Sequence, residues 1–439
     1  MTEGRRVAVI GAGPSGLPAL KNFAELRFEV TGFDKSVGVG GNWRFDDDAG
    51  HSSVFETTHL ISSKTLSEYE DFPFAQDVAE YPSHRELLNY FESYAEHFDL
   101  PSKIRFRTEV MSLTPADAER WRIQSRHLDT GERSNEVFDV VCVCNGHHHT
   151  PRWPDYEGQF DGEYLHSHDY KRAAPFADKR VLVIGGGNSA CDVAVETARI
   201  SKTTVMSWRR GYHLIPKFLF GLPTDVFGHR FGRGPLWLQR RLMQGLITLV
   251  QGRNRDIGLP EPDHRMFETH PTMNSDLYLA VRHGRVRVKG DIERLDGKDV
   301  IFTDGSRETF DAIIACTGYE TRHDFIDPSV FDFRHEKPRL YQKMIPETYP
   351  NIYFIGLFQP LGCIWPGAEL QAKLAARHAA GFWSPRSPLK TLIDRELAKP
   401  DVEQLTSARH NITVHDGSFR KRLRRELARA RGVTATRVS

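Results

Sequence analysis

Residues 7–20 read VAVIGAGPSGLPAL, and this stretch decides the fold that the sequence predicts. The apolar run before the glycines is typical of a strand buried on both faces of a parallel sheet. In the turn, Gly11 permits the tight bend, Gly13 lets the backbone approach a pyrophosphate, and Gly16 lets the following helix pack closely on the strand. The amino end of that helix faces the anion with its positive dipole. The stretch therefore predicts the phosphate-binding turn of a dinucleotide fold.

A second strand supports this interpretation. Residues 28–35, FEVTGFDK, place Asp34 near the strand end, where its carboxylate can accept hydrogen bonds from ribose hydroxyls. A glycine turn that serves only packing would not require a strand, a turn, a helix and an acid in this order. The residues predicted to contact the first dinucleotide are Gly11, Gly13, Pro14, Ser15, Gly16, Asp34 and Lys35.

The same design returns at residues 181–194, VLVIGGGNSACDVA. A helix follows, and then the strand TTVMSWRR, residues 203–210. Arg209 and Arg210 stand where the first unit has Asp34, and a guanidinium there can pair with the 2′-phosphate of NADP. The alternative is that both arginines are solvated charges at a strand end. The residues predicted to contact this second dinucleotide are Gly185, Gly187, Asn188, Ser189, Ala190, Arg209 and Arg210.

Two dinucleotide sites in one chain suggest electron transfer between two cofactors, and FAD with NADPH is the commonest such pair. Because the second turn interrupts the first fold, the sequence predicts an α/β protein with two Rossmann-like dinucleotide-binding domains. The NADPH domain is expected to be inserted into a discontinuous FAD domain. The predicted boundaries are 1–170 for the first part of the FAD domain, 171–311 for the NADPH domain, and 312–439 for the second part of the FAD domain with C-terminal helices.

The composition disfavours several classes of protein. With 59 Lys plus Arg against 58 Asp plus Glu, the formal net charge of +1 gives no field that would attract nucleic acid. No apolar run approaches the ~20 residues of a membrane span, so a soluble cytoplasmic protein is expected. The cysteines are scattered and form no CxxC motif, which argues against a disulfide reductase. The oligomeric state is left open, a homodimer included.

Several motifs resemble those of the flavin-containing monooxygenases, class B flavoprotein monooxygenases, and of their bacterial type. Residues 160–170, FDGEYLHSHDY, match the family fingerprint FxGxxxHxxxY and lie shortly before the second glycine turn. GGNW at residues 40–43 is similar to the family's GGxW, and ACTGYE at residues 315–320 to its ATGY linker. The resemblance extends over most of the chain.

This resemblance implies an enzyme that uses FAD, NADPH and O2 to place one oxygen atom on a small-molecule substrate. The oxygen would be transferred through a C4a-(hydro)peroxyflavin to a soft nucleophile, an amine or a sulfide, or to a ketone. Because the flavin carries the reactive oxygen, no side chain is assigned as catalytic. The sequence does not identify the substrate. The resemblance adds Gly41, Asn42, Trp43, Leu60, Ile61 and Gln371 as cofactor contacts.

One position departs from the family. The family usually carries asparagine in TNxSK, and THLISSK at residues 58–64 has Ile61 in its place. Isoleucine cannot form a side-chain hydrogen bond, so Ser62 and Lys64 join Ile61 as flavin-adjacent candidates. An NADPH oxidase that releases hydrogen peroxide is therefore the main alternative function, and a non-catalytic protein that kept the cofactors is a weaker one. A rearranged pocket with normal coupling is equally compatible with Ile61.

Three further features are interpreted as structural. His147, His148 and His149 are adjacent, and neighbours in an extended segment point apart, so no metal site is predicted. The amphipathic segment 235–252 is expected to pack on the protein. The basic segment 418–432 is expected to be a solvated helix.

Overall fold

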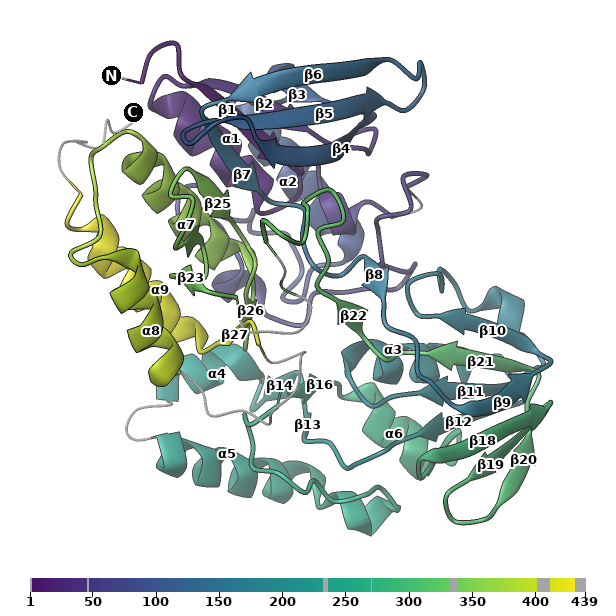
Figure 1. The fold of residues 1–439 in the computed structure, drawn as a ribbon. Helices are drawn as coiled ribbons and strands as arrows, with labels where there is room; N and C mark the ends of the chain where they lie inside the picture. The colour runs from purple at the N-terminus through teal and green to yellow at the C-terminus, as the bar shows by residue number, and fades with distance from the viewer. Residues whose placement is uncertain are drawn as a thin grey trace.

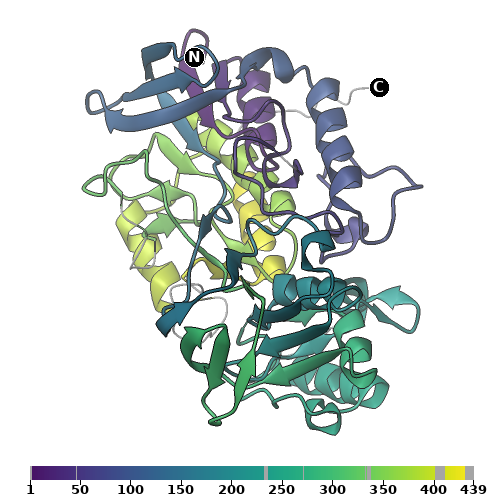
Figure 2. The same cartoon turned by 90° about the vertical axis from the view of Figure 1, so that its right-hand side faces the viewer.

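Two parallel sheets, one in each of two units, organise the computed structural model (Figures 1 and 2). The structure describes residues 2–45, 47–231, 236–269, 271–331, 333, 338–400 and 411–430. Each sheet has five strands, with helices on one face and a smaller sheet on the other, antiparallel in the first unit and mixed in the second. The predicted class, α/β with two Rossmann-like domains and one inserted into the other, is confirmed.

The first sheet has the strand order β25-β7-β1-β2-β3. Its central strand is completely apolar at its middle, and Val7, Ala8 and Val9 have no exposed surface. Because β25 comes late in the chain, this unit is discontinuous. The strands are β1 (Arg6–Ile10), β2 (Glu29–Phe33), β3 (Ile104–Arg105), β7 (Val140–Val143) and β25 (Ile352–Phe354).

Both faces of the first sheet are covered. Helices α1 (Gly16–Glu25) and α7 (Trp365–Ala379) share one core with β1, to which Phe419 and Leu423 of α9 (Asp416–Leu427) also belong. The basic helix α9 is thus anchored by an apolar face and is not merely solvated. The other face packs against an antiparallel sheet of β4 (Thr108–Pro115), β5 (Trp121–His127) and β6 (Arg133–Phe138).

The second sheet repeats this plan with the order β10-β21-β11-β12-β17. Its strands are β10 (Glu163–His166), β11 (Arg180–Ile184), β12 (Thr203–Ser207), β17 (Val286–Lys289) and β21 (Ala312–Ala315). Helices α3 (Asn188–Thr197) and α6 (Asp276–Arg282) cover one face. The other face packs against β9 (Glu157–Phe160), β18 (Ile292–Gly297), β19 (Asp299–Phe302) and β20 (Arg307–Thr309).

The strand pairing corrects the predicted boundaries. β9 and β10 precede residue 171, yet they belong to the second unit, and so does β21, which pairs in parallel with β11 from Val181↔Ala312 to Ile184↔Ala315. The apolar run at 312–315 is therefore the last strand of the inserted unit and not the first of the returning one. The chain crosses between the units at β8 (Thr150–Pro151) and β22 (Tyr319–Glu320), which pair side by side (Figure 1).

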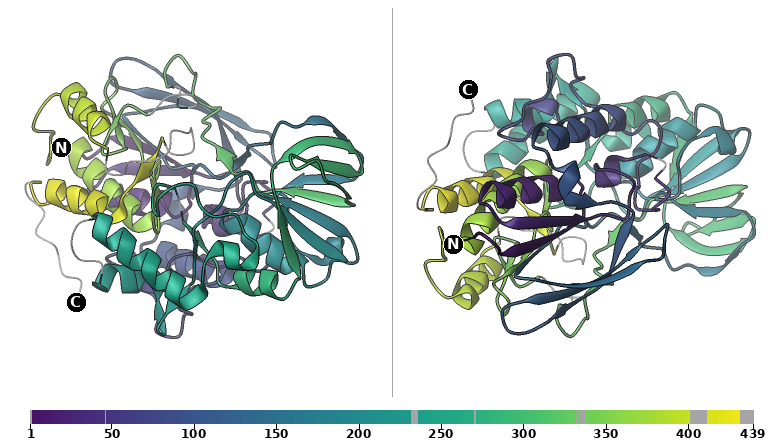
Figure 3. Two further views of the ribbon diagram at one scale, coloured as in Figure 1. Left: turned by 90° about the horizontal axis from the view of Figure 1, so that it is seen from below. Right: turned by 90° about the horizontal axis from the view of Figure 1, so that it is seen from above.

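The remaining elements surround this frame (Figure 3). Helix α2 (His84–His97) begins at a capping box in which Ser83 and Glu86 bond to each other's backbone amides. Helix α5 (Leu236–Gln251) packs through Ile247 and leaves Trp237, Leu242 and Leu249 exposed, so the expected packing of this segment is only partial. The other elements are α4 (Thr224–Phe231), α8 (Leu389–Ala398), β13 (Leu214–Ile215), β14 (Phe218–Leu219), β15 (Leu222–Pro223), β16 (Thr272–Met273), β23 (Leu340–Tyr341), β24 (Ile345–Pro346), β26 (Gln359–Pro360) and β27 (Thr413–Val414).

Within the described part of the chain, no helix combines the length and the apolar character needed to cross a membrane.

Candidate active site at the junction of the two units

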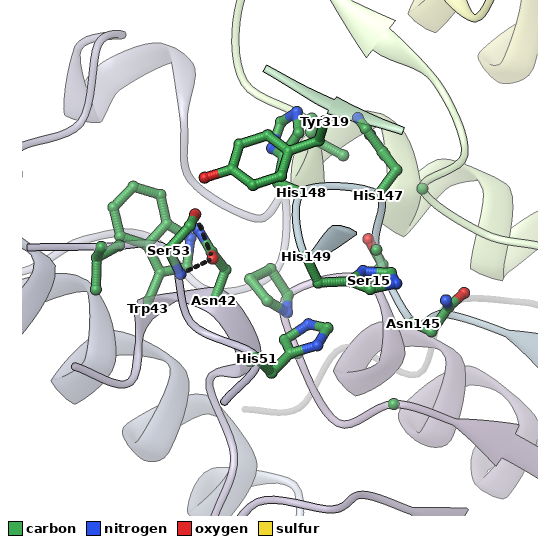
Figure 4. A pocket seen from close by; sticks show the side chains of 18 of the residues that line it. Ser15, Asn42, Trp43, His51, Ser53, Asn145, His147, His148, His149 and Tyr319 are labelled. Carbon is green, nitrogen blue, oxygen red and sulfur yellow. Dashed lines mark hydrogen bonds between the residues drawn. The ribbon is translucent and has the colours of Figure 1, made fainter. Parts of the chain in front are cut away.

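A cavity of about 810 Å³ lies between the two units and is lined by residues of both. It extends from the first glycine turn, through the linker residues 144–152 and 316–322, to the amino end of α3. Figure 4 shows Ser15, Asn42 and Trp43 of the first unit facing His149 and Tyr319 of the linker. The cavity therefore connects the two sites that the sequence predicted separately.

The first glycine turn is shaped by close backbone contacts. Gly11 has φ +101°, and a Cβ there would lie 2.7 Å from the carbonyl oxygen of Cys144. A Cβ on Gly16 would lie 1.8 Å from the carbonyl oxygen of Gly11. Side chains at these positions are excluded by backbone atoms, which leaves the amino end of α1 open toward the cavity. Gly13, Pro14 and Ser15 line the wall.

The second turn repeats the first contact almost identically. Gly185 has φ +120°, and a Cβ there would lie 2.6 Å from the carbonyl oxygen of Cys316. In each unit the first glycine thus packs against the carbonyl that follows the neighbouring parallel strand, β7 or β21. The second turn also brings its helix amino end to the cavity, where Gly187, Asn188, Ser189 and Ala190 form the wall.

Asp34 lines the cavity and holds the first glycine turn in place through hydrogen bonds. Its Oδ2 accepts a hydrogen bond from the amide of Ala12 at 2.6 Å, and its Oδ1 accepts one from the amide of Ser36 at 2.8 Å. Burial raises the pKa of this carboxyl despite the two amides, which lower it. Lys35 lines the same part of the cavity.

The residues predicted from the resemblance to face the flavin line the same cavity, beginning with Gly41, which lies next to Gly13 of the first turn. Gly41, Asn42, Trp43, Leu60, Ile61 and Ser62 all line the cavity. Asn42 Oδ1 accepts hydrogen bonds from the amide and the hydroxyl of Ser53 at 2.8 and 2.9 Å (Figure 4). The ring of Trp43 stands edge-on to that of Trp365, with centroids 5.9 Å apart. These contacts fix the wall before any ligand binds.

Six of the predicted residues do not line the cavity: the cofactor contacts Gly16, Gly185, Arg209, Arg210 and Gln371, and the flavin-adjacent candidate Lys64. Gln371 is fully buried in α7, where its Oε1 accepts from the amide of Gly356 and its Nε2 donates to the carbonyl of Gln342, both at 2.9 Å. Lys64 donates from Nζ to the carbonyls of Gln76, at 3.0 Å, and of Val78. Both side chains thus hold loops of the first unit.

Two histidines, His51 and His149, line a part of the cavity wall to which the sequence analysis assigned no role. The rings of His51 and His149 stack with centroids 4.9 Å apart. Burial, each other's proximity and Lys35 lower the pKa of His51 to about 3, and burial and Lys35 lower that of His149 to about 4. Both imidazoles are therefore neutral at pH 7. Among the described residues no group of three or more His, Cys, Asp or Glu could hold a metal ion.

Two glycine turns of one design, facing each other across one cavity, define a protein that holds two dinucleotides. The chain belongs to the flavin-binding monooxygenase-like family, whose model matches residues 4–413. It is 34% identical over 432 residues to flavin-containing monooxygenase 5 of Homo sapiens, covering 93% of this chain and 80% of that protein. It is 32% identical over 419 residues to dimethylaniline monooxygenase [N-oxide-forming] 2 of Cavia porcellus, covering 91% and 78%.

Solved structures share the fold. A steroid monooxygenase bound to NADP superposes with a TM-score of 0.74 at 19% identity, covering 96% of this chain and 97% of that one. S-allyl-L-cysteine S-oxygenase from Allium sativum superposes with a TM-score of 0.71 at 21% identity, covering 98% and 90%. The protein is accordingly an FAD- and NADPH-dependent monooxygenase. Its two glycine cradles, which a Cβ would fill, suit two dinucleotides.

Proposed function

We propose that the protein transfers one oxygen atom of O2 to a soft nucleophile, an amine or a sulfide, that enters the cavity between the two units. The observation that carries the proposal is the continuity of this cavity from the first turn to the second. The activities for which two similar proteins are named, N-oxide formation and S-oxygenation, support an amine or a sulfide. A ketone is the competing substrate class, because cyclohexanone monooxygenase shares the fold at 17% identity.

The proposal gives each unit one cofactor. FAD would lie with its pyrophosphate at the amino end of α1, its ribose near Asp34, and its ring between Trp43 and Ile61. NADPH would lie with its pyrophosphate at the amino end of α3 and its 2′-phosphate near Arg209 and Arg210. Bound FAD supplies the redox chemistry with O2. The residues of the chain bind and orient the cofactors and keep water from the wall.

The test measures how the electrons supplied by NADPH are divided between oxygenated product and hydrogen peroxide. Purified holoenzyme is given NADPH with methyl p-tolyl sulfide, N,N-dimethylaniline or cyclohexanone, and NADPH loss, O2 uptake, product and hydrogen peroxide are measured together. One sulfoxide or N-oxide for each NADPH supports the proposal. A lactone as the only product would assign the ketone class, and peroxide alone would assign an NADPH oxidase.

An NADPH oxidase is a second candidate function, because Ile61 on the cavity wall cannot form the side-chain hydrogen bond of the asparagine usual in the family. Two neighbouring polar groups that could replace an amide there are already engaged, whereas the buried hydroxyl of Ser63 has no hydrogen-bond partner among the described residues. The hydroxyl of Ser62 pairs with that of Ser67 at 2.8 Å, and the amide of Ser63 donates to Asp225 Oδ2 at 2.6 Å. At Ile61 itself the cavity wall next to the proposed flavin ring is apolar.

In Ile61→Asn, a larger share of the consumed NADPH is expected to yield oxygenated product and a smaller share to yield hydrogen peroxide. One hydrogen bond in a dry site is worth ~1–3 kcal/mol, so the ratio of oxygenated product to hydrogen peroxide should rise about ten- to hundredfold. The measurement is the product-to-peroxide ratio with a saturating sulfide. Ile61→Leu is the control, because it keeps the apolar volume and adds no amide. An unchanged ratio in Ile61→Asn would show that coupling does not depend on this position.

Two further properties belong to the proposal. We expect the protein to function in the cytoplasm, and its oligomeric state, a homodimer included, is open. Cell fractionation and analytical ultracentrifugation of the holoenzyme measure these directly.

A further inference from the structure

Asp192 is a carboxyl group on the cavity wall for which the proposed function gives no role. It lies in α3, four residues after Asn188, and residues four apart share one face of a helix. Both residues line the cavity, on the side of α3 that faces the first unit. Asp192 is therefore about 6 Å farther along the helix than its amino end, at 1.5 Å per residue.

The carboxyl group is held in one orientation. Asn274 Nδ2 donates to Asp192 Oδ1 at 2.6 Å, and Asn274 is itself fixed because its Oδ1 accepts from the amide of Leu277 at 2.7 Å. Asn188 Oδ1 accepts from the amide of Met273 at 2.7 Å, which holds the same segment against α3. Among the described residues no donor bonds to Oδ2 of Asp192. One acceptor oxygen on the wall is thus left for a ligand.

The surroundings place the ionisation of Asp192 near neutral pH. Burial raises the pKa of the carboxyl to about 7, and the nearby carboxylates of Asp276 and Glu196 act in the same direction. Lys217 and the hydrogen bond from Asn274 oppose this. The thiols Cys191 and Cys316 also lie within electrostatic reach, and burial together with Asp192 raises the pKa of each.

We propose that Asp192 binds the nicotinamide end of the NADP cofactor, with Oδ2 accepting a hydrogen bond from the carboxamide NH2. This inference rests on the proposed placement of NADPH at the second turn. From a pyrophosphate at the amino end of α3, the nicotinamide must run along the wall toward the first unit to meet the flavin. The carboxamide NH2 is its donor group, and an ionised carboxylate is purely an acceptor.

The charge of Asp192 should give the oxidised and reduced forms of the cofactor different affinities for this site. The nicotinamide ring is neutral in NADPH and carries a positive charge in NADP+. An ionised carboxylate beside the ring therefore favours NADP+ more than NADPH. Asp192→Asn keeps the shape and removes the charge, so it should weaken NADP+ binding more than NADPH binding.

The pH dependence has a definite sign. The ionised form binds the ligand better, so affinity is fully present above the pKa of the free carboxyl and is lost as the pH falls below it. With a pKa of about 7, the Kd of NADP+ should be about tenfold larger at pH 6 than at pH 8, because the competent fraction falls by that factor.

The experiment compares two ligands with the FAD-loaded protein. NADP+ and 2′,5′-ADP, which lacks nicotinamide but carries the 2′-phosphate, are titrated at pH 6, 7 and 8, with the flavin absorbance change or calorimetry as the readout. For Asp192→Asn, the Kd of NADP+ at pH 8 should rise at least tenfold and lose the Asp192-dependent change with pH. The Kd of 2′,5′-ADP should stay within twofold at each pH.

Glu196→Gln is the matched control. Glu196 lies one turn farther along the same helix, its pKa is also raised by burial, and it bonds to Thr57 at 3.0 Å away from the cavity wall. The Glu196→Gln variant should bind NADP+ at pH 8, where Asp192 is ionised, as the wild type does.

The possible results separate this inference from the proposed function. An unchanged NADP+ affinity in Asp192→Asn, or an equal loss of 2′,5′-ADP affinity, would overturn the role of Asp192 and leave the second turn as the NADPH site. Failure of the wild type to bind 2′,5′-ADP would overturn that site, and this inference with it.

Discussion

Gly16→Ala is expected to abolish FAD binding and to lower the thermal stability by several degrees. A Cβ on residue 16 would lie 1.8 Å from the carbonyl oxygen and 2.9 Å from the carbonyl carbon of Gly11. Both are backbone atoms of the turn, so the clash is relieved only if α1 moves away from β1. Overpacking of this kind costs ~1–3 kcal/mol or more, and the shift removes the phosphate-binding amides from their place. The ratio of flavin to protein absorbance after purification, with the Tm, measures the effect.

The glycine-turn motif alone would allow alanine at residue 16, because the second turn carries Ala190 at the equivalent position. There the methyl group of Ala190 is accommodated, fully buried in the core of the second unit. The matched control is Gly245→Ala in α5, where a Cβ meets nothing within 4 Å. That variant should bind FAD normally and unfold at the wild-type temperature or up to a few degrees higher, because alanine is favoured by ~1 kcal/mol in a helix. A Gly16→Ala protein with one FAD and an unchanged Tm would contradict the clash.

The second large effect concerns cofactor choice. Arg209→Ala with Arg210→Ala should lower the preference for NADPH over NADH by about a hundredfold or more, because each hydrogen bond from a guanidinium to phosphate is worth ~1.5–3 kcal/mol. The two arginines follow β12, whose last residue Ser207 pairs with Ile184 immediately before the second turn. Arg209 is exposed, and the buried Nε of Arg210 has no hydrogen-bond partner among the described residues. The measurement is kcat/KM for flavin reduction with each cofactor.

Arg199→Ala is the control for the loss of a positive charge. Arg199 is exposed and lies just beyond the carboxyl end of α3, the end opposite to the proposed phosphate site. Its replacement should leave the NADPH to NADH ratio unchanged. If the double variant keeps its preference for NADPH, the arginines are only solvated charges at a strand end.

The sequence by itself determined the fold class and the position of both dinucleotide turns. These features depend on short-range patterns, namely an apolar strand, glycines at a set spacing and a helix, and the backbone contacts of Gly11 and Gly185 show why the pattern is strict. The placement of Asn42, Trp43 and Ile61 on the cavity wall was also anticipated, through the motifs that resemble the family.

Only the tertiary structure decided which strands pair and which way side chains point. The run at 312–315 is apolar in either unit, and its pairing with β11 assigns it to the second. Gln371 and Lys64 carry groups suited to a cofactor, but packing directs them to backbone carbonyls and amides of loops. The stacked pair of His51 and His149, like the contact between Asp192 and Asn274, joins residues distant in the sequence. Such contacts arise when folding brings separate segments together, and no local pattern encodes them.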